Sequence, residues 1–310
     1  MDLFTLYQRL KPDNKTENHG LSVTTDELIR QQKYLAFMNF KARYTSHYAG
    51  DVKSVFKGRG MEFEEVRAYN FGDDVRDIDW RVTARKSEPY TKIFSEEKDR
   101  EVSVVLDLSS SMVFGTKKEL KSVTACKLAA MLGWMSMRHK DRFGLVIFNG
   151  RDSVYLKPQN DMKSLISAFG KIADASRKVL TQSYDQDISE ALKIVQYHHK
   201  GQGICFIISD FRHFDQNQFE RIALLAAHYE IYCMNVFDVI EETAPQDGVY
   251  AAQFNDKKVV FDTGLSSFKD NYQQYFAQQR ANLKRNCQKF SCKYMEIRTD
   301  IPIFKQLSIK

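Results

Sequence analysis

The stretch EVSVVLDLSSSM (Glu101–Met112) joins a buried strand to a cluster of oxygen ligands. Its first part, Val102–Leu106, is short, rich in β-branched residues and almost wholly apolar, which is typical of a strand covered on both faces in a parallel sheet. Asp107, Ser109 and Ser111 follow at intervals of two residues. Because ligands bind at the carboxyl ends of strands in open α/β sheets, this stretch is the first candidate for a functional site.

The composition is that of an ordinary globular protein, with 310 residues, 43% of them hydrophobic and 28% charged. The longest apolar runs are of strand length, far below the roughly 20 residues of a membrane-spanning helix, so no membrane span is predicted. Residues 1–7 lack a basic stretch followed by an apolar core, and the five cysteines are scattered without a disulfide pattern. We therefore expect a cytoplasmic protein.

The net charge of +6 lies mostly in the C-terminal part, where residues 246–310 carry 11 Lys and Arg against 6 Asp and Glu. A helix is predicted there over residues 266–288, and its Lys and Arg alternate with Gln and Asn. This pattern favours a solvated helix face over a nucleic-acid-binding surface. No nucleic-acid partner is predicted.

From residue 99 onward, apolar strands and helices alternate along the chain. Strands are predicted at residues 102–106, 143–148, 153–156, 204–209 and 231–237, and helices at residues 117–138, 162–172, 188–198 and 217–229. Repeated units of this kind predict an α/β fold with a doubly wound, mainly parallel sheet. We assign residues 99–310 to this domain, which closes with a hairpin (249–254 and 257–261), the basic helix and a strand at 293–297.

Residues 1–98 are predicted to form an N-terminal extension with α and β elements. A helix is expected over residues 24–44, with Thr24 and Glu27 forming a capping box at its start. The segment 57–85 has a dense mixture of arginines and acidic residues, for which internal ion pairs are the favoured interpretation. Its glycines at 58 and 60 lack the strand, the helix and the Lys-Ser/Thr ending of a phosphate-binding loop.

A carboxylate and two hydroxyls at a strand-to-helix turn are ligands that suit Mg²⁺ or Mn²⁺, which bind sets of oxygen atoms. Asp210 can supply a second carboxylate, because it ends another apolar strand and the carboxyl ends of parallel strands meet at one edge. The predicted metal ligands are Asp107, Ser109, Ser111 and Asp210. The alternative is that Asp107 and the serines only cap the following helix.

These residues resemble the D-x-S-x-S metal-ion-dependent adhesion site of von Willebrand factor type A domains. The preceding segment is similar to the signature of the bacterial domain-of-unknown-function family number 58, in which such a segment leads into a type A domain. The motifs that carry this resemblance are Gly58-Arg59-Gly60, Glu62-Phe63, Val66-Arg67, Tyr69, Gly72-Asp73-Asp74, Arg76, Ile78-Asp79-Trp80 and Ala84-Arg85. Together the matches span about residues 25–240.

One position departs from the type A pattern. These domains bring a threonine to the metal from a G-T-D-I-x-x-A-L loop, and the matching stretch at residues 186–192 has Gln186 at the threonine position. An amide oxygen or a water can take that place. The resemblance implies a protein-binding function without turnover, in which this protein is an adaptor or substrate-binding subunit of a MoxR-type AAA+ ATPase that acts on a client protein.

Two other functions compete with this interpretation. The first is an Mg²⁺-dependent hydrolase or phosphotransferase at the same edge, but aspartate-nucleophile enzymes of the haloacid dehalogenase type need a carboxylate where Ser109 stands. No nucleophile elbow, zinc helix or phosphate loop is present either. The second is an interaction domain whose metal site has been lost, with the charged segment 57–85 as its working surface.

Overall fold

The computed structural model describes residues 20–37, 61–86, 88–96, 100–182, 184–198, 203–245, 248–254, 257–264 and 266–307. The chain forms two compact units. One combines Met1–Phe40 with Glu101–Lys310, and the other is Lys41–Arg100. The sequence-based boundary near residue 98 thus lies close to the end of the smaller unit, while the N-terminal helix groups with the sheet.

A six-stranded sheet forms the centre of the larger unit, in the order β10-β7-β6-β3-β4-β5. The strands are β3 (Glu101–Asp107), β4 (Arg142–Phe148), β5 (Ser153–Gln159), β6 (Gly203–Ser209), β7 (Tyr229–Phe237) and β10 (Lys293–Arg298). All pairs are parallel except β4 with β5. The predicted mainly parallel α/β sheet is confirmed.

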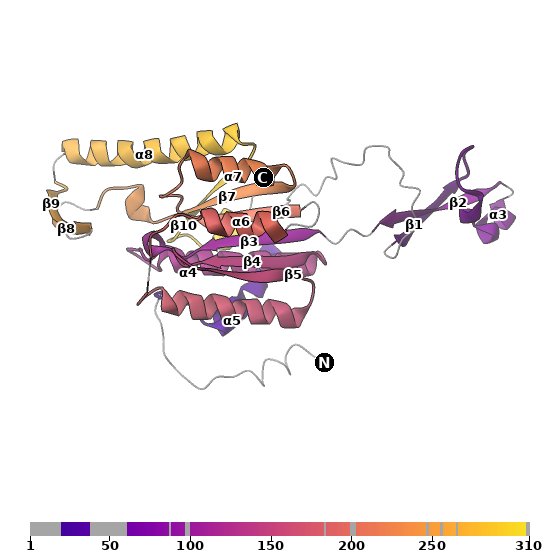
Figure 1. The fold of residues 1–310 in the computed structure, drawn as a ribbon, viewed down its shortest axis with the longest axis horizontal. Coiled ribbons are helices and arrows are strands. Elements are labelled where there is room, and N and C mark those ends of the chain that lie inside the picture. The colour runs from indigo at the N-terminus through magenta and orange to yellow at the C-terminus, as the bar shows by residue number, and fades with distance from the viewer. Residues whose placement is uncertain are drawn as a thin grey trace. The chain divides into compact units, whose positions relative to one another are not determined.

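Helices cover both faces of this sheet (Figure 1). They are α4 (Lys121–Arg138), α5 (Met162–Lys178), α6 (Ser189–His198) and α7 (Gln216–Ala226). Every residue of β3 is buried between them, with Val105 beside Val146 of β4 and Ile207 of β6. The apolar side chains of α6 and α7 pack into one cluster on one face. The centre of β3 is almost wholly apolar because both of its faces are covered.

The N-terminal helix α2 (Thr25–Arg30) packs with α4 and α5. The predicted capping box is present, since the Thr24 hydroxyl accepts from the Glu27 N–H and the Glu27 carboxylate accepts from the Thr24 N–H. The prediction of one helix over residues 24–44 was wrong in its length. After Arg30 the chain continues as the 3-10 helix η1 (Gln31–Phe37), and the expected remainder lies outside the described residues. Leu28 is the buried residue of α2, and the 3-10 segment η1 that follows it packs against α4.

The smaller unit contains an antiparallel pair of strands, β1 (Met61–Ala68) and β2 (Tyr90–Glu96), with the 3-10 helix η2 (Val75–Asp77) and helix α3 (Trp80–Lys86) between them. Part of the expected charge pairing is present in the segment 57–85. The Arg67 guanidinium lies 2.8 Å from the Asp73 carboxylate. Asp74 and Asp79 instead cap η2 and α3 by accepting backbone N–H groups.

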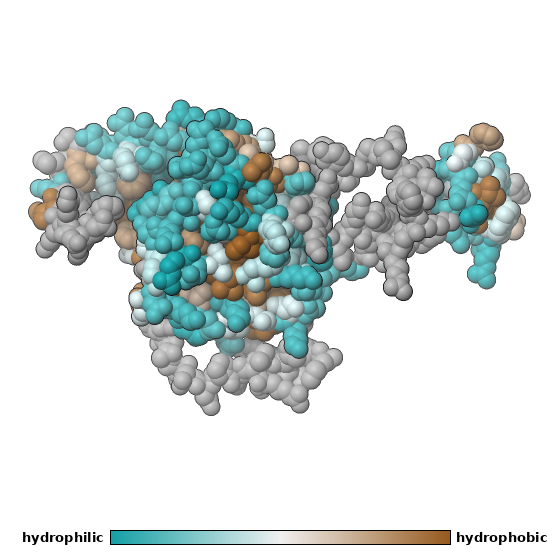
Figure 2. All heavy atoms as spheres, viewed as in Figure 1, coloured by the Kyte–Doolittle hydropathy of each residue, from teal (hydrophilic) through white to brown (hydrophobic). Residues whose placement is uncertain are grey.

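The C-terminal elements follow the sequence-based prediction closely. They are the hairpin β8 (Val249–Phe254) and β9 (Lys257–Asp262), helix α8 (Ser266–Lys289), strand β10 and the short helix α9 (Ile303–Gln306). Figure 2 shows mainly hydrophilic side chains over α8. Among the described residues, no helix combines the length and the apolar character needed to cross a membrane.

Candidate metal centre

The predicted ligands meet at the switch point of the sheet. Numbered in chain order from β3, the strands run 3-2-1-4-5-6 across the sheet, which is the order of a doubly wound fold. The chain reverses its direction of winding between the neighbouring parallel strands β3 and β6. Asp107 is the last residue of β3, and Asp210 directly follows β6. The topology therefore places both carboxylates at the edge where such folds bind ligands.

Hydrogen bonds join the two sides of this edge. The Ser111 hydroxyl donates to Oδ1 of Asp210 at 3.1 Å and lies 3.4 Å from the Ser109 hydroxyl. Oδ1 of Asp107 accepts from the backbone N–H of Ser109 at 2.8 Å. Asp107 and Ser109 are buried, whereas Ser111 is half-buried. All four predicted ligands thus belong to one connected cluster.

The charge of Asp107 is poorly compensated. Burial and the negative charge of Asp210 raise the pKa of Asp107 to about 6, although hydrogen bonds from Ser209 and Ser109 oppose this rise. A divalent cation beside the two carboxylates relieves such a repulsion. The uncompensated charge of Asp107 is therefore compatible with a bound cation.

The second carboxylate has its own positive partner. Nζ of Lys121 lies 2.7 Å from Oδ2 of Asp210 and 3.2 Å from Oε1 of Glu241. Burial by itself raises the pKa of Asp210, but the charge and hydrogen bond of Lys121 outweigh it and bring that pKa below its usual value. Lys121 itself is fully buried.

The donor set fits a hard divalent ion. Two carboxylates and two hydroxyls supply oxygen atoms, which are the ligands that Mg²⁺ and Mn²⁺ take from proteins. In the described part of the chain, no cluster of three or more His, Cys, Asp and Glu side chains is placed to hold a metal. The serine hydroxyls are therefore needed to complete the protein's share of the ligands.

No hydrogen bond among the described residues joins the side chain of the fifth predicted position, Gln186, to the cluster. Its side chain is exposed, and its backbone N–H donates to the carbonyl of Gly150 at 2.7 Å. The neighbouring Asp185 reaches the edge instead, because its Oδ1 accepts from the Ser110 hydroxyl at 2.9 Å. Within the described residues, the loop that follows α5 thus places the Asp185 carboxylate against Ser110, beside the cluster.

The family model described as "Protein of unknown function DUF58" matches residues 65–282. The chain belongs to this family. The match includes most of the signature segment and the whole candidate metal centre, so the resemblance noted in the sequence is confirmed. The sheet order and the cluster described above give this DUF58 protein the fold of a von Willebrand factor type A-like domain.

Relatives and solved structures are similar over most of the chain. The uncharacterized protein Rv1480 of Mycobacterium tuberculosis is 26% identical over 252 residues, which cover 81% of this chain and 78% of Rv1480. BatB from Bacteroides thetaiotaomicron has 17% identity and a TM-score of 0.43, covering 67% of this chain and 93% of BatB. The SpRpn10 VWA domain has 12% identity and a TM-score of 0.38, with coverage of 67% and 93%.

The half-buried Ser110 and the exposed Asp185 and His213 resemble the members of a nucleophilic triad, but their bonding differs. The Ser110 hydroxyl and Nε2 of His213 both contact the same oxygen of Asp185, at 2.9 and 2.8 Å. A serine nucleophile instead needs a hydrogen bond to its histidine base. The present arrangement ties the loop after α5 to the ends of β3 and β6.

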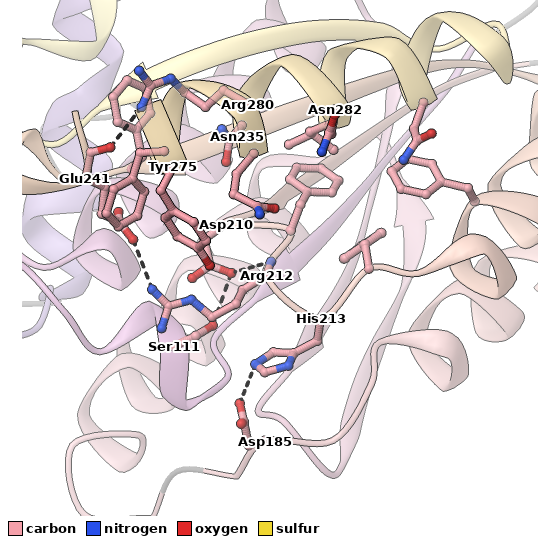
Figure 3. Close-up of a pocket in the computed structure, with 18 of the residues that line it drawn as sticks. Ser111, Asp185, Asp210, Arg212, His213, Asn235, Glu241, Tyr275, Arg280 and Asn282 are labelled. Carbon is pink, nitrogen blue, oxygen red and sulfur yellow. Dashed lines mark hydrogen bonds and ion pairs between the residues drawn. The ribbon is translucent and has the colours of Figure 1, made fainter. Parts of the chain in front are cut away.

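A cavity of about 850 Å³ opens beside the cluster, between the sheet edge and α8 (Figure 3). Ser111, Asp210 and Arg212 line its side nearest the candidate metal centre. Aromatic rings from the sheet edge and polar side chains of α8, including Tyr275 and Asn282, line the rest. A ligand that binds at Asp210 can therefore extend into this cavity, which has room for the groups next to the one that binds.

Three residues of the centre were missed in the sequence: Lys121, Ser209 and Glu241. Local sequence carried no signal for Lys121, because its place in the helix depends on where α4 begins. The structure starts α4 at Lys121 rather than at the predicted residue 117, which puts a lysine in the first turn of an almost wholly buried helix. A cation there opposes the helix dipole, so its presence indicates an acidic partner.

Proposed function

We propose that this DUF58 protein is a non-enzymatic protein-binding module that uses a Mg²⁺ or Mn²⁺ ion at the carboxyl edge of its sheet. The observation that carries the proposal is the bonded cluster of Asp107, Ser109, Ser111 and Asp210 at the switch point. Hydroxyl ligands are neutral, so an ion held by two carboxylates keeps positive character and open positions. An Asp or Glu side chain of a partner can complete the ion's ligands.

The cavity beside the cluster supports binding of a polypeptide rather than of an isolated ion or small acid. Its walls combine aromatic rings with amide side chains, including Asn235 from β7 and Asn282 from α8 (Figure 3). Amides both donate and accept hydrogen bonds, which suits the main chain of a bound segment. Residues next to the partner's acidic side chain would occupy this space.

The partner class follows from the family resemblance. We propose a MoxR-type AAA+ ATPase as the partner, with this protein as the adaptor that presents a client protein in the cytoplasm. A pull-down with wild type and Asp107→Ala as baits, each in Mg²⁺ and in chelator, tests this role. The ATPase should be recovered by wild type in Mg²⁺ alone; equal recovery in all four conditions would show that no ion organises binding.

Calorimetric titration with Mn²⁺ tests the metal site directly. Wild type should give saturable heat, and Asp107→Ala should lose it because a buried carboxylate ligand is removed. Asp161→Ala is the matched control, since Asp161 only caps the exposed start of α5. Equal heats from wild type and Asp107→Ala would sink the metal site. An Mg²⁺-dependent phosphatase assay on p-nitrophenyl phosphate, in which we expect no turnover, tests the enzymatic alternative.

A further inference from the structure

Lys121 is an unusual residue for the position that it occupies. It is the first residue of α4 and has no exposed surface. The N-terminus of a helix carries partial positive charge, so a buried ammonium there is unfavourable unless carboxylates compensate it. A residue that is costly to the fold at this position therefore points to a role at the neighbouring metal centre.

Two carboxylates share this ammonium. Nζ lies 2.7 Å from Oδ2 of Asp210, whose side chain is 5% exposed, and 3.2 Å from Oε1 of Glu241, whose side chain is 10% exposed. Oδ1 of Asp210 accepts from Ser111 on the side of the candidate metal centre. Asp210 is therefore bonded to the metal centre through one oxygen and to Lys121 through the other.

A divalent ion and an ammonium on one carboxylate repel each other strongly at this degree of burial. The carboxylate of Glu241 can relieve this repulsion, because Lys121 can keep its bond to Glu241 when it moves away from Asp210. We propose that Lys121 is a built-in cation that competes with the divalent ion for Asp210, with Glu241 as its alternative partner. This inference rests on the proposed function, in which the edge binds such an ion.

A shift of Lys121 from Asp210 to Glu241 would also affect Arg212, which lines the cavity. Its guanidinium bonds the same Oε1 of Glu241 at 3.2 Å and is 49% exposed on the cavity side (Figure 3). When Lys121 turns fully to Glu241, it neutralises the charge that holds Arg212. Metal loading thereby releases a guanidinium toward the acidic segment that the ion recruits. Cation binding and partner binding are coupled by this shared carboxylate.

Mn²⁺ titration of four variants tests the exchange. Lys121→Met should bind Mn²⁺ about tenfold or more tightly than wild type, because the competing charge is gone. Glu241→Gln should bind about tenfold more weakly, since Lys121 then has Asp210 alone. Lys127→Met is the control for charge removal, because Lys127 lies on the same helix but pairs with Glu119; its affinity should stay at the wild-type value.

The double variant Lys121→Met/Glu241→Gln separates competition from general electrostatics. If Glu241 acts through Lys121, the glutamine has no effect once the lysine is absent, and the double variant matches Lys121→Met. Additive effects of the two substitutions, or an unchanged affinity in Lys121→Met, would overturn the competition while leaving the metal site intact. An absence of Mn²⁺ binding in every variant would overturn both.

Thermal unfolding gives a second readout for the same variants. In chelator, Lys121→Met should unfold at a lower temperature than wild type, because Asp210 and Glu241 lose their buried cation. Saturating Mn²⁺ should restore most of this loss. A loss that Mn²⁺ leaves unchanged would show that Lys121 serves the fold alone.

Discussion

The Ser209 hydroxyl donates a hydrogen bond to Oδ2 of Asp107 at 2.6 Å, and both side chains are buried. Ser209 is the last residue of β6 and Asp107 the last of β3, so this bond ties the two strand ends that flank the switch point. The Ser209 oxygen also accepts from the backbone N–H of Phe211 at 3.0 Å. One small side chain thus orients the Asp107 carboxylate and the turn that carries Asp210.

Replacing Ser209 by alanine should destabilise the protein by about 1–3 kcal/mol, because a buried carboxylate loses a donor. Urea unfolding at neutral pH measures this change. The control is Ser110→Ala, whose hydroxyl bonds the exposed Asp185, and it should cost less than about 0.5 kcal/mol. Equal effects of the two substitutions would mean that the Ser209–Asp107 hydrogen bond contributes no more to stability than the bond of Ser110 at the surface.

Gly150 supports the loop near the metal centre through its backbone. Its φ is +89°, and a Cβ atom at this position would lie 1.9 Å from the carbonyl oxygen of Tyr184. That carbonyl accepts from the backbone N–H of Ser110 at 2.9 Å. Gly150→Ala should therefore cost about 1–3 kcal/mol and weaken Mn²⁺ binding as well.

Gly170→Ala is the matched control, because Gly170 lies in α5 and a Cβ atom added there would meet no other atom within 4 Å. Alanine there should stabilise the protein by up to about 1 kcal/mol through its helix propensity. Denaturant unfolding of both variants gives the comparison. Similar effects at the two glycines would contradict the backbone requirement at Gly150.

Leu28 holds helix α2 on the sheet domain. It is fully buried, and its carbonyl accepts from the indole N–H of Trp134 in α4 at 3.2 Å. Leu28→Ala should cost about 2–5 kcal/mol, since a buried side chain leaves a cavity. Leu21→Ala, at a side chain that is 52% exposed, should change the unfolding free energy by less than about 0.5 kcal/mol. A single unfolding transition followed by circular dichroism measures both.

Asp238 should make stability depend on pH. Burial opposes its ionisation, but hydrogen bonds from Thr116, Ile240 and Thr299 outweigh burial and lower its pKa below the ordinary 3.8. The folded state then binds the proton less tightly than the unfolded chain does. Its contribution to stability is therefore present above pH 3.8 and is lost as the pH falls through the lower, folded-state pKa.

Asp238→Asn should lose about 1–3 kcal/mol at pH 7, because the amide nitrogen cannot accept these bonds. Its stability should also fall less steeply than that of wild type in the acid range. Urea unfolding between neutral and acid pH provides both values. Asp152→Asn, at an exposed ion pair with Arg151, is the control and should keep the wild-type slope. Parallel acid slopes in wild type and Asp238→Asn would refute the assignment.

The sheet could be predicted because its strands carry their own signal. Val102–Leu106 is buried on both faces, so burial appears directly as an almost wholly apolar run. The end of α2 was not predictable. Past Arg30 the chain keeps apolar residues, but whether they continue an α-helix depends on contacts with α4 that local sequence does not encode.

The residues of the candidate site that directly follow the ends of strands were predicted from the sequence. Asp107, Ser109 and Ser111 are local neighbours, and Asp210 follows from the rule that parallel strands end at one edge. Lys121 was not found, because its pairing with Asp210 depends on where α4 begins and on how it lies against the sheet. Gln186 was assigned by its place in a motif, and the bond of its neighbour Asp185 to Ser110 depends on loop geometry that local sequence does not encode.

The placement of the Lys41–Arg100 unit between α2 and β3 makes the sheet domain discontinuous along the chain. Helix α4 of this domain packs against α2 and η1, which lie on the other side of the Lys41–Arg100 unit in the sequence. One cut within Lys41–Arg100 would therefore yield two fragments that associate without a covalent link. The N-terminal fragment would bind the rest of the domain noncovalently and help it to fold. The indole of Trp134, which donates to the Leu28 carbonyl of this fragment, would report the binding.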